Sequence, residues 1–363
     1  MTTPTHADYL AQRRFPGLDG LRAIAAVLVV LFHFEGPDIL QGWIGVHLFF
    51  VLSGFLITTL LLREHDRTGR VALVDFYLRR AFRILPLYFL VLAAVVVGCL
   101  FAGTFHSSGL GAALPLQLTF LNEFTQNNPY GHSWTLGTEQ KFYLFWPLLA
   151  FVGTASTVRR FGVAVAGGVL ALALVPITLG QSSPNWTLGY FSILVGCLLA
   201  LVLHHPRGYA VLRPLTGPVA SVAVAVAFVA FHLSVKAIGP VLGGWFGVPA
   251  AMAVTPVYAI ACAFLLPAAI SGLPVQRALS TGPMRFVGER SYSLYLVQGI
   301  AGGAVALVGT FGGARPVVVL AVALVLAHVL YRLVELPMIT VGQKVLARRN
   351  VRPAVETEIL RVP

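Results

Sequence analysis

Two ionisable residues lie in the first long apolar run of the sequence, where charged groups are costly. Arg22 stands near the start of this run and His33 near its end, eleven positions later. In a helix with 3.6 residues per turn, this spacing puts both side chains on one face, about 16 Å apart along the axis. A neutral imidazole can take a proton from a hydroxyl group at pH 7, because its ordinary pKa is about 6.5. The alternative is a snorkelling arginine and a histidine at the membrane surface.

A second cluster consists of arginines. Arg79, Arg80 and Arg83 occur within five residues, and Arg80 and Arg83 are spaced to share one helix face. Guanidinium groups bind phosphate through paired hydrogen bonds, so this cluster is a candidate site for an anionic donor molecule. The alternative is an ordinary cytoplasmic anchor at the end of a spanning helix.

A third cluster combines a carboxylate with aromatic residues. Trp134, Glu139 and Tyr143 follow a long polar segment, where another apolar run begins. Such groups can bind a sugar, because an aromatic ring covers a C–H face while a carboxylate accepts hydrogen bonds from hydroxyl groups. The alternative is an aromatic belt with a solvated glutamate. His132, just before this cluster, can equally be an ordinary loop residue, and we assign it no role.

The elements that carry these clusters follow from the composition. The chain has 363 residues, of which 57% are hydrophobic and 10% are charged. A soluble domain has about 25% charged residues, so this chain could not cover a water-facing surface. Apolar helices suit lipid, because they satisfy their own backbone hydrogen bonds. We therefore predict an all-α polytopic membrane protein. The net charge of +12 does not indicate nucleic-acid binding, because the basic residues stand between apolar runs.

A spanning helix needs about 20 mostly apolar residues. We expect about ten such helices, at residues 18–36, 43–62, 84–104, 141–158, 161–179, 188–204, 215–233, 249–271, 291–311 and 316–338.

The basic residues of the connecting segments predict the orientation of these helices. With the N-terminus inside, the outer segments carry only Lys141, Lys236 and Arg315, whereas the inner ones carry most of the arginines. Cytoplasmic segments of membrane proteins have this excess of positive residues, so both ends are expected in the cytoplasm.

The chain therefore divides into three expected parts. These are a cytoplasmic N-terminal segment at 1–16, a transmembrane domain at 17–341 and a cytoplasmic tail at 342–363, for which disorder is expected. The first apolar run lacks a cleavage site after it and should remain a helix. The cysteines Cys99, Cys197 and Cys262 lie in apolar runs and indicate neither a disulfide nor a zinc site. No metal cofactor is expected.

In sequence order, these clusters resemble the motifs of the membrane-bound acyltransferase-3 family. The motifs are FPGLDGLRA at 15–23 with His33 after it, GVHLFFVLSGFLI at 45–57, RRAFRILP at 79–86, WTLGTEQKFY at 134–143, SYSLYL at 291–296 and ELP at 335–337. They extend over nearly the whole chain. Two positions depart from the pattern: His47 stands where many members have an acidic residue, and Gln298 where many have a histidine.

This resemblance implies an enzyme of the plasma membrane that moves an acyl group, usually acetyl from acetyl-CoA, onto a sugar hydroxyl. It implies that His33 is the catalytic histidine and Arg22 its paired arginine. Arg80 and Arg83 fall on a second arginine motif, and Glu139 on a conserved carboxylate.

On this basis we expect cytoplasmic acyl-CoA to bind at Arg22, Arg79, Arg80 and Arg83, with its thioester reaching His33. A sugar or glycan acceptor would enter from the outside near Trp134 and Tyr143. Glu139 would orient the imidazole or the acceptor. Direct transfer and an acyl-histidine intermediate remain equally open, and the oligomeric state is not indicated.

Two other classes compete with this interpretation. The first is a transporter or flippase for a glycan or small molecule, which the helix count suits but which the lack of an obvious internal repeat disfavours. The second is a structural or signalling membrane protein with a degenerate site, against which the Arg22 and His33 pair argues. Ester formation from labelled acetyl-CoA would distinguish an enzyme from a transporter.

Overall fold

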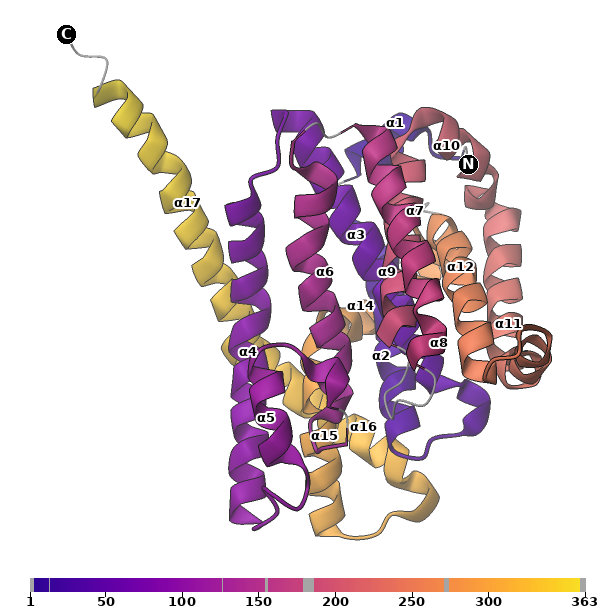
Figure 1. The fold of residues 1–363 in the computed structure, drawn as a ribbon, viewed down its shortest axis with the longest axis vertical. Coiled ribbons are helices and arrows are strands. Elements are labelled where there is room, and N and C mark those ends of the chain that lie inside the picture. Colours follow the sequence, from indigo (N-terminus) through magenta and orange to yellow (C-terminus); the bar gives the residue numbers. More distant parts are fainter. Residues whose placement is uncertain are drawn as a thin grey trace.

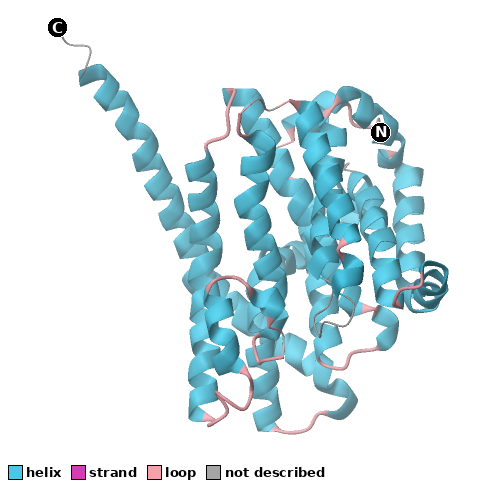
Figure 2. Cartoon of the chain, in the orientation of Figure 1, coloured by secondary structure: helices cyan, strands magenta, loops and turns pink. Residues whose placement is uncertain are grey.

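The computed structural model describes residues 3–12, 14–125, 127–153, 156–178, 186–270 and 274–359, with side chains described as far as Arg349. Within these ranges every regular element is a helix and no strand occurs (Figure 2). The predicted all-α fold is therefore confirmed.

Seventeen α-helices follow one another along the described chain. They are α1 (His6–Ala11), α2 (Pro16–His33), α3 (Gly45–Thr68), α4 (Leu73–Phe101), α5 (Leu110–Leu118), α6 (Trp134–Phe151), α7 (Thr157–Ala173), α8 (Val175–Thr178), α9 (Trp186–His204), α10 (Pro206–Leu212), α11 (Pro218–Phe246), α12 (Ala250–Ile270), α13 (Pro274–Leu279), α14 (Gly282–Glu289), α15 (Ser291–Val308), α16 (Arg315–Leu330) and α17 (Leu336–Ile359). A short π-helical segment, Tyr331–Glu335, joins the last two.

Among the described residues, eight helical stretches are long and apolar enough to cross a membrane. They contain α2, α3, α4, α9, α11, α12, α15 and α16. Two of the expected spans, 141–158 and 161–179, correspond to α6 and α7, which run alongside the others in the bundle (Figure 1). α7 has 17 residues, and α6 carries Glu139, Gln140 and Lys141. That these two also cross the membrane stays a prediction.

Three helices extend beyond the apolar runs that predicted them. α4 begins at Leu73 rather than at 84, and α6 begins at Trp134 rather than at 141. The chain after 341, expected to be disordered, continues in α17 as far as Ile359, and residues 360–363 lie outside the described residues. Hydrophobicity sets the length of chain buried in lipid, whereas arginine, glutamate and leucine all favour helix on either side of it. The arginine cluster thus lies within α4 and not before it.

α2 occupies the centre of the bundle, in contact with α3, α12, α13, α14, α15 and α16. Close crossings around it depend on glycine. A Cβ on Gly54 of α3 would lie 1.9 Å from the carbonyl oxygen of Ile193, and one on Gly196 of α9 would lie 2.1 Å from that of Val51. Small residues at such crossings let two backbones approach closely without a hydrophobic driving force.

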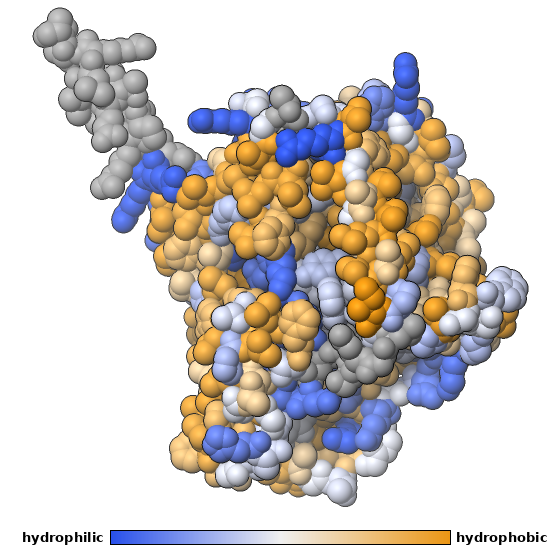
Figure 3. All heavy atoms as spheres, in the orientation of Figure 1, coloured by the Kyte–Doolittle hydropathy of each residue, from blue (hydrophilic) through white to orange (hydrophobic). Residues whose placement is uncertain are grey.

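The outer surface of the bundle is apolar. On the face shown in Figure 3, hydrophobic side chains cover most of the surface, and most hydrophilic ones gather near its upper and lower ends. Exposed residues of the long helices include Leu90, Leu149, Val169, Val226 and Val325. An apolar belt of this kind fits a lipid environment. The described start of the chain and the end of α17 lie toward the same end of the bundle, as an even number of crossings requires (Figure 1).

Candidate active site

Three arginines predicted to act together meet in a cavity of about 100 Å³ between α2, α3, α4, α6 and α15. Arg22 comes from α2, and Arg80 and Arg83 come from α4, one turn apart. Glu139 of α6 also lines this space, which we call the arginine cavity. Three guanidinium groups and one carboxylate give a formal charge of +3 − 1 = +2. The arginine cavity is therefore suited to bind an anion.

Glu139 is held by neighbours on both carboxylate oxygens. The hydroxyl of Ser53 in α3 donates to Oε1 at 2.6 Å, and the hydroxyl of Tyr143 donates to Oε2 at 3.2 Å. Ser53 and Tyr143 line the same cavity. The bond from Ser53 to Glu139 links α3 to α6 beside the arginines.

Two of the arginine side chains of this cavity are held by neighbouring groups. The guanidinium carbon of Arg80 lies 5.3 Å from the centre of the Tyr143 ring and 5.9 Å from that of Phe76. Arg22 contacts Asp19, one turn earlier on α2, with an N–O distance of 3.3 Å. Cation–π contacts position a guanidinium group while leaving its N–H edge free for a ligand.

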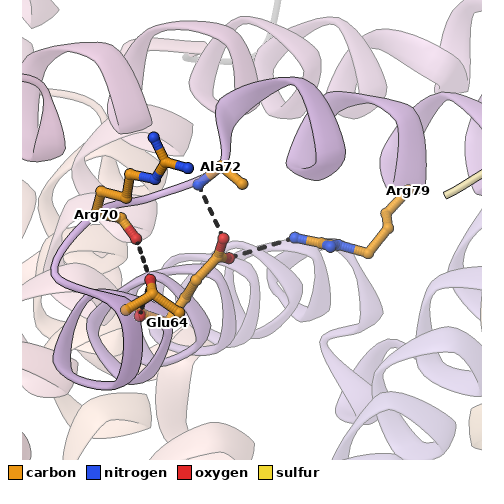
Figure 4. A network of polar contacts seen from close by, with 5 residues as sticks. Glu64, Arg70, Ala72 and Arg79 are labelled. Carbon is orange, nitrogen blue, oxygen red and sulfur yellow. Dashed lines mark hydrogen bonds and ion pairs between the residues drawn. The ribbon is translucent and has the colours of Figure 1, made fainter. Parts of the chain in front are cut away.

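Arg79 does not join the other arginines. Its side chain is 48% exposed and forms an ion pair with Glu64 at 3.3 Å. The same carboxylate accepts a hydrogen bond from the backbone N–H of Ala72 at 2.9 Å (Figure 4). Successive helical residues point about 100° apart, so Arg79 and Arg80 face different surroundings. Through Glu64, Arg79 links the end of α3 to the start of α4. The structure places it outside the arginine cavity.

His33 lines a second and larger cavity of about 580 Å³, which we call the histidine cavity. His47, His132, Trp43 and Trp134 also line it. The His33 residue is exposed and lines this cavity, so its imidazole is reachable from the cavity. Arg22 and His33, predicted to share one face of α2, thus open into two different cavities.

The orientation of His33 identifies its basic nitrogen. Nδ1 lies 2.9 Å from the carbonyl oxygen of Val29. A carbonyl oxygen only accepts hydrogen bonds, so Nδ1 carries the hydrogen in the neutral ring. The unprotonated Nε2 is then the atom that can take a proton from a substrate.

His132 accompanies His33 in this cavity. The two ring centres are 6.3 Å apart. His132 belongs to the 3₁₀ turn η4 (Gly131–Ser133), outside the spanning helices, and burial is the main reason that its pKa is lowered to about 3. It is therefore neutral at pH 7 and adds no charge beside His33. The sequence offered no assignment for this residue.

Val46 and Tyr295 line both cavities and form the wall between them. The hydroxyl of Thr135 donates to the Tyr295 oxygen at 2.8 Å. The Tyr295 hydroxyl in turn donates to the backbone carbonyl of His132. This chain of hydrogen bonds connects α6, α15 and η4 at the boundary between the arginines and His33.

The predicted carboxylate and aromatic residues are divided by this wall. Glu139 and Tyr143 line the arginine cavity, whereas Trp134 lines the histidine cavity. The expectation that Glu139 orients the imidazole is not met by this arrangement. Residues five and nine positions after Trp134 on a helix lie about 7 and 13 Å further along its axis, which is enough to reach the other compartment.

The two residues that depart from the motif pattern both lie near the imidazole. His47 lines the histidine cavity, and its Nδ1 lies 2.9 Å from the hydroxyl oxygen of Ser192. The buried side chain of Gln298 reaches the His33 ring, and its amide nitrogen donates to the carbonyl of Tyr295 at 3.0 Å. Neither is an acidic residue, so neither brings a carboxylate close to His33.

Sequence reasoning missed several residues of the site. Ser53, Tyr292 and Tyr295 stand within motifs that the sequence displayed, but nothing in those motifs distinguished them from packing residues. Trp43, in the turn η2 (Gly42–Ile44) before α3, had no motif signal at all.

The described helices define a polytopic membrane protein, with a cavity suited to an anion next to a cavity that His33 lines. The profile of the acyltransferase domain of the acyltransferase-3 family matches residues 15–332. The chain belongs to this family of membrane acyltransferases.

Several curated relatives are O-acetyltransferases by name. YrhL of Bacillus subtilis, provisionally named a peptidoglycan O-acetyltransferase, is 30% identical over 93% of this chain and 57% of its own length. OatA of Listeria monocytogenes, named a peptidoglycan O-acetyltransferase, is 29% identical over 79% of this chain and 49% of its own. The chain thus spans about half the length of these relatives. No solved structure matches it significantly.

Proposed function

We propose that this protein transfers an acetyl group from cytoplasmic acetyl-CoA to a hydroxyl group of a cell-wall glycan, with His33 as the base. The observation that carries this proposal is the position of Arg22 and His33. Both belong to α2, and each lines one of two adjoining cavities. The names of the relatives support peptidoglycan as the acceptor. A cell-wall acceptor and a cytoplasmic donor would meet at the plasma membrane, which we propose as the location.

The donor would bind through its phosphates in the arginine cavity. Arg22, Arg80 and Arg83 supply the charge for this contact, and the Glu139 carboxylate holds Ser53 and Tyr143 in the wall of the site. The pantetheine arm would pass between Val46 and Tyr295, which separate the two cavities. Arg79 takes no part, because it pairs with Glu64.

The acceptor would occupy the histidine cavity, with its hydroxyl at His33 and a sugar face against Trp134. Nε2 of His33 removes the hydroxyl proton while the oxygen attacks the thioester carbonyl carbon. The carbon–sulfur bond breaks, the ester forms, and the thiolate of CoA leaves with the proton from the imidazolium. An acyl-histidine route needs the same residues and gives the same products.

The direct test uses the purified protein in lipid nanodiscs with radiolabelled acetyl-CoA and peptidoglycan-derived glycans. We expect labelled ester with the wild-type protein. The His33→Ala variant should lose at least about 100-fold in rate, the typical contribution of a general base, while its thermal unfolding midpoint stays unchanged.

Two results would contradict the proposal. Ester formation at the wild-type rate in the His33→Ala variant would show that His33 is not the base. Movement of the glycan across the bilayer without ester formation would indicate a transporter. Acetylation of the glycan with an acetyl donor other than acetyl-CoA would overturn the assignment of the arginine cavity alone.

A further inference from the structure

A third cavity of about 380 Å³ adjoins the histidine cavity. It lies between the C-terminal end of α2, the 3₁₀ turn η1 (Asp38–Leu40), α11 and the start of α12. Phe32, Gly42, Trp43 and Ala251 line both this lateral cavity and the histidine cavity. The two spaces therefore meet, with Trp43 at their junction.

The segment that carries Trp43 is held in one conformation. Gln41 is buried and has a left-handed backbone with φ of 43°, which costs energy in a residue other than glycine. Its side-chain carbonyl accepts from the Trp43 indole at 3.2 Å, and its amide donates to the backbone carbonyl of Asp38. These bonds orient the indole ring and account for the unusual backbone.

α11 braces the same segment from the other side. Nε2 of His232 lies 2.8 Å from the carbonyl oxygen of Leu40, and Lys236 forms an ion pair with Asp38 at 2.9 Å. Asp38 and Lys236 are both largely exposed and line the lateral cavity. The cavity thus has a fixed aromatic ring at one end and a pair of charged groups at its rim.

We propose that the histidine and lateral cavities form one groove for a glycan of at least two sugars, with the neighbouring sugar stacked on Trp43. This inference rests on the proposed function, which places the reacting hydroxyl at His33. Each cavity alone falls in the range of about 300–1,000 Å³ that holds a small ligand, so the groove has room for more than the reacting sugar.

The chemistry of the lateral cavity favours a sugar over a lipid chain. A fixed indole offers a flat face to the C–H bonds of a pyranose ring, while the Asp38–Lys236 pair offers partners for its hydroxyl groups. Gly36, Gly42 and Gly239 also line this space, so a polar ligand can approach backbone groups closely. Apolar side chains such as Leu31, Val235 and Val254 line much of the rest of this cavity, so the oriented ring and the charged pair, and not the lining as a whole, point to a sugar.

The experiment compares peptidoglycan-derived glycans of one, two and four sugars as acceptors, with acetyl-CoA held constant. The wild-type protein should use the longer glycans with kcat/KM about two- to tenfold above that for the single sugar, which is the effect of one stacking contact. Trp43→Ala should reduce this ratio toward one, mainly through KM, and Trp43→Phe should restore most of it.

A second tryptophan supplies the matched control. Trp245, near the end of α11, is 76% exposed and lines neither cavity, so Trp245→Ala should keep the wild-type ratio. Equal use of one and four sugars, or a ratio that Trp43→Ala leaves intact, would overturn the groove while the proposed function stands. A preference set by an attached lipid tail, whatever the number of sugars, would also overturn it. Absence of transfer to every acceptor would overturn the proposed function and this inference with it.

Discussion

At the scale of single residues, the site separates charge from proton transfer. The guanidinium groups of Arg22, Arg80 and Arg83 gather in one cavity, while the ring of His33 faces a cavity whose described lining contains no arginine, lysine, aspartate or glutamate. A phosphate-bearing donor is best stabilised among cations, whereas a neutral imidazole must be kept from them to remain a base. Val46 and Tyr295 mark the boundary between the two cavities, which the donor's arm crosses in the proposed reaction.

The arginines provide the test at this scale. Replacing Arg80 or Arg83 with alanine removes a charged partner of the donor phosphates, a contact worth about 1.5–3 kcal/mol. We expect KM for acetyl-CoA to rise at least about tenfold in each variant, measured as labelled ester against donor concentration. Arg79→Ala is the matched control from the same helix and should leave KM unchanged. An equal rise of KM in all three variants would show that these arginines anchor the helix at the membrane surface and do not bind the donor specifically.

At the scale of elements, close helix crossings bring these residues together. α3 and α9 cross at Gly54 and Gly196, and this contact fixes α3, which supplies Val46 and Ser53 to the two cavities. No side chain fits at Gly54, because its Cβ would enter the carbonyl of Ile193. The position of the α3 axis therefore depends on Gly54, a residue without a side chain that takes no part in the reaction.

Gly54→Ala tests this crossing. The added methyl group must push α3 and α9 apart, and overpacking of this kind typically costs about 1–3 kcal/mol. We expect a lower thermal unfolding midpoint in detergent and a loss of transferase activity. Gly98→Ala on α4 is the control, because nothing lies within 4 Å of its Cβ position and alanine favours helix. A destabilisation of the same size in both variants would show that the crossing at Gly54 is not special.

At the scale of the whole molecule, the apolar surface and the excess of inner arginines predict an orientation in the membrane. The three native cysteines are free and buried, so they should give little background in labelling experiments. The segment between α4 and α5 is expected outside, and the end of α3 inside.

Labelling of single introduced cysteines tests this orientation. Ser107→Cys should react with a membrane-impermeant maleimide in intact cells, and Arg67→Cys only after permeabilisation, because both positions are exposed on the protein surface but on opposite sides. Reaction of Arg67→Cys in intact cells would reverse the topology and place the arginine cavity on the wrong side for a cytoplasmic donor.

Much of the fold followed from the sequence by itself. Hydrophobic run length determined the helical class and nearly all of the long helices, because a bilayer allows few other ways to satisfy backbone hydrogen bonds. Helical periodicity determined that Arg22 and His33 share a face of α2. The motifs also supplied Arg80, Arg83 and Glu139 as site residues, which meet at the arginine cavity.

The tertiary structure alone decided how these residues are divided. It assigned Glu139 to the arginines, Trp134 to His33, and Arg79 to Glu64 on the surface. It also placed Trp43, in a turn without any motif, between two cavities. The physical reason is that spacing along one helix fixes direction and height, whereas the compartment that a side chain enters depends on the packing of other helices, which no local pattern encodes.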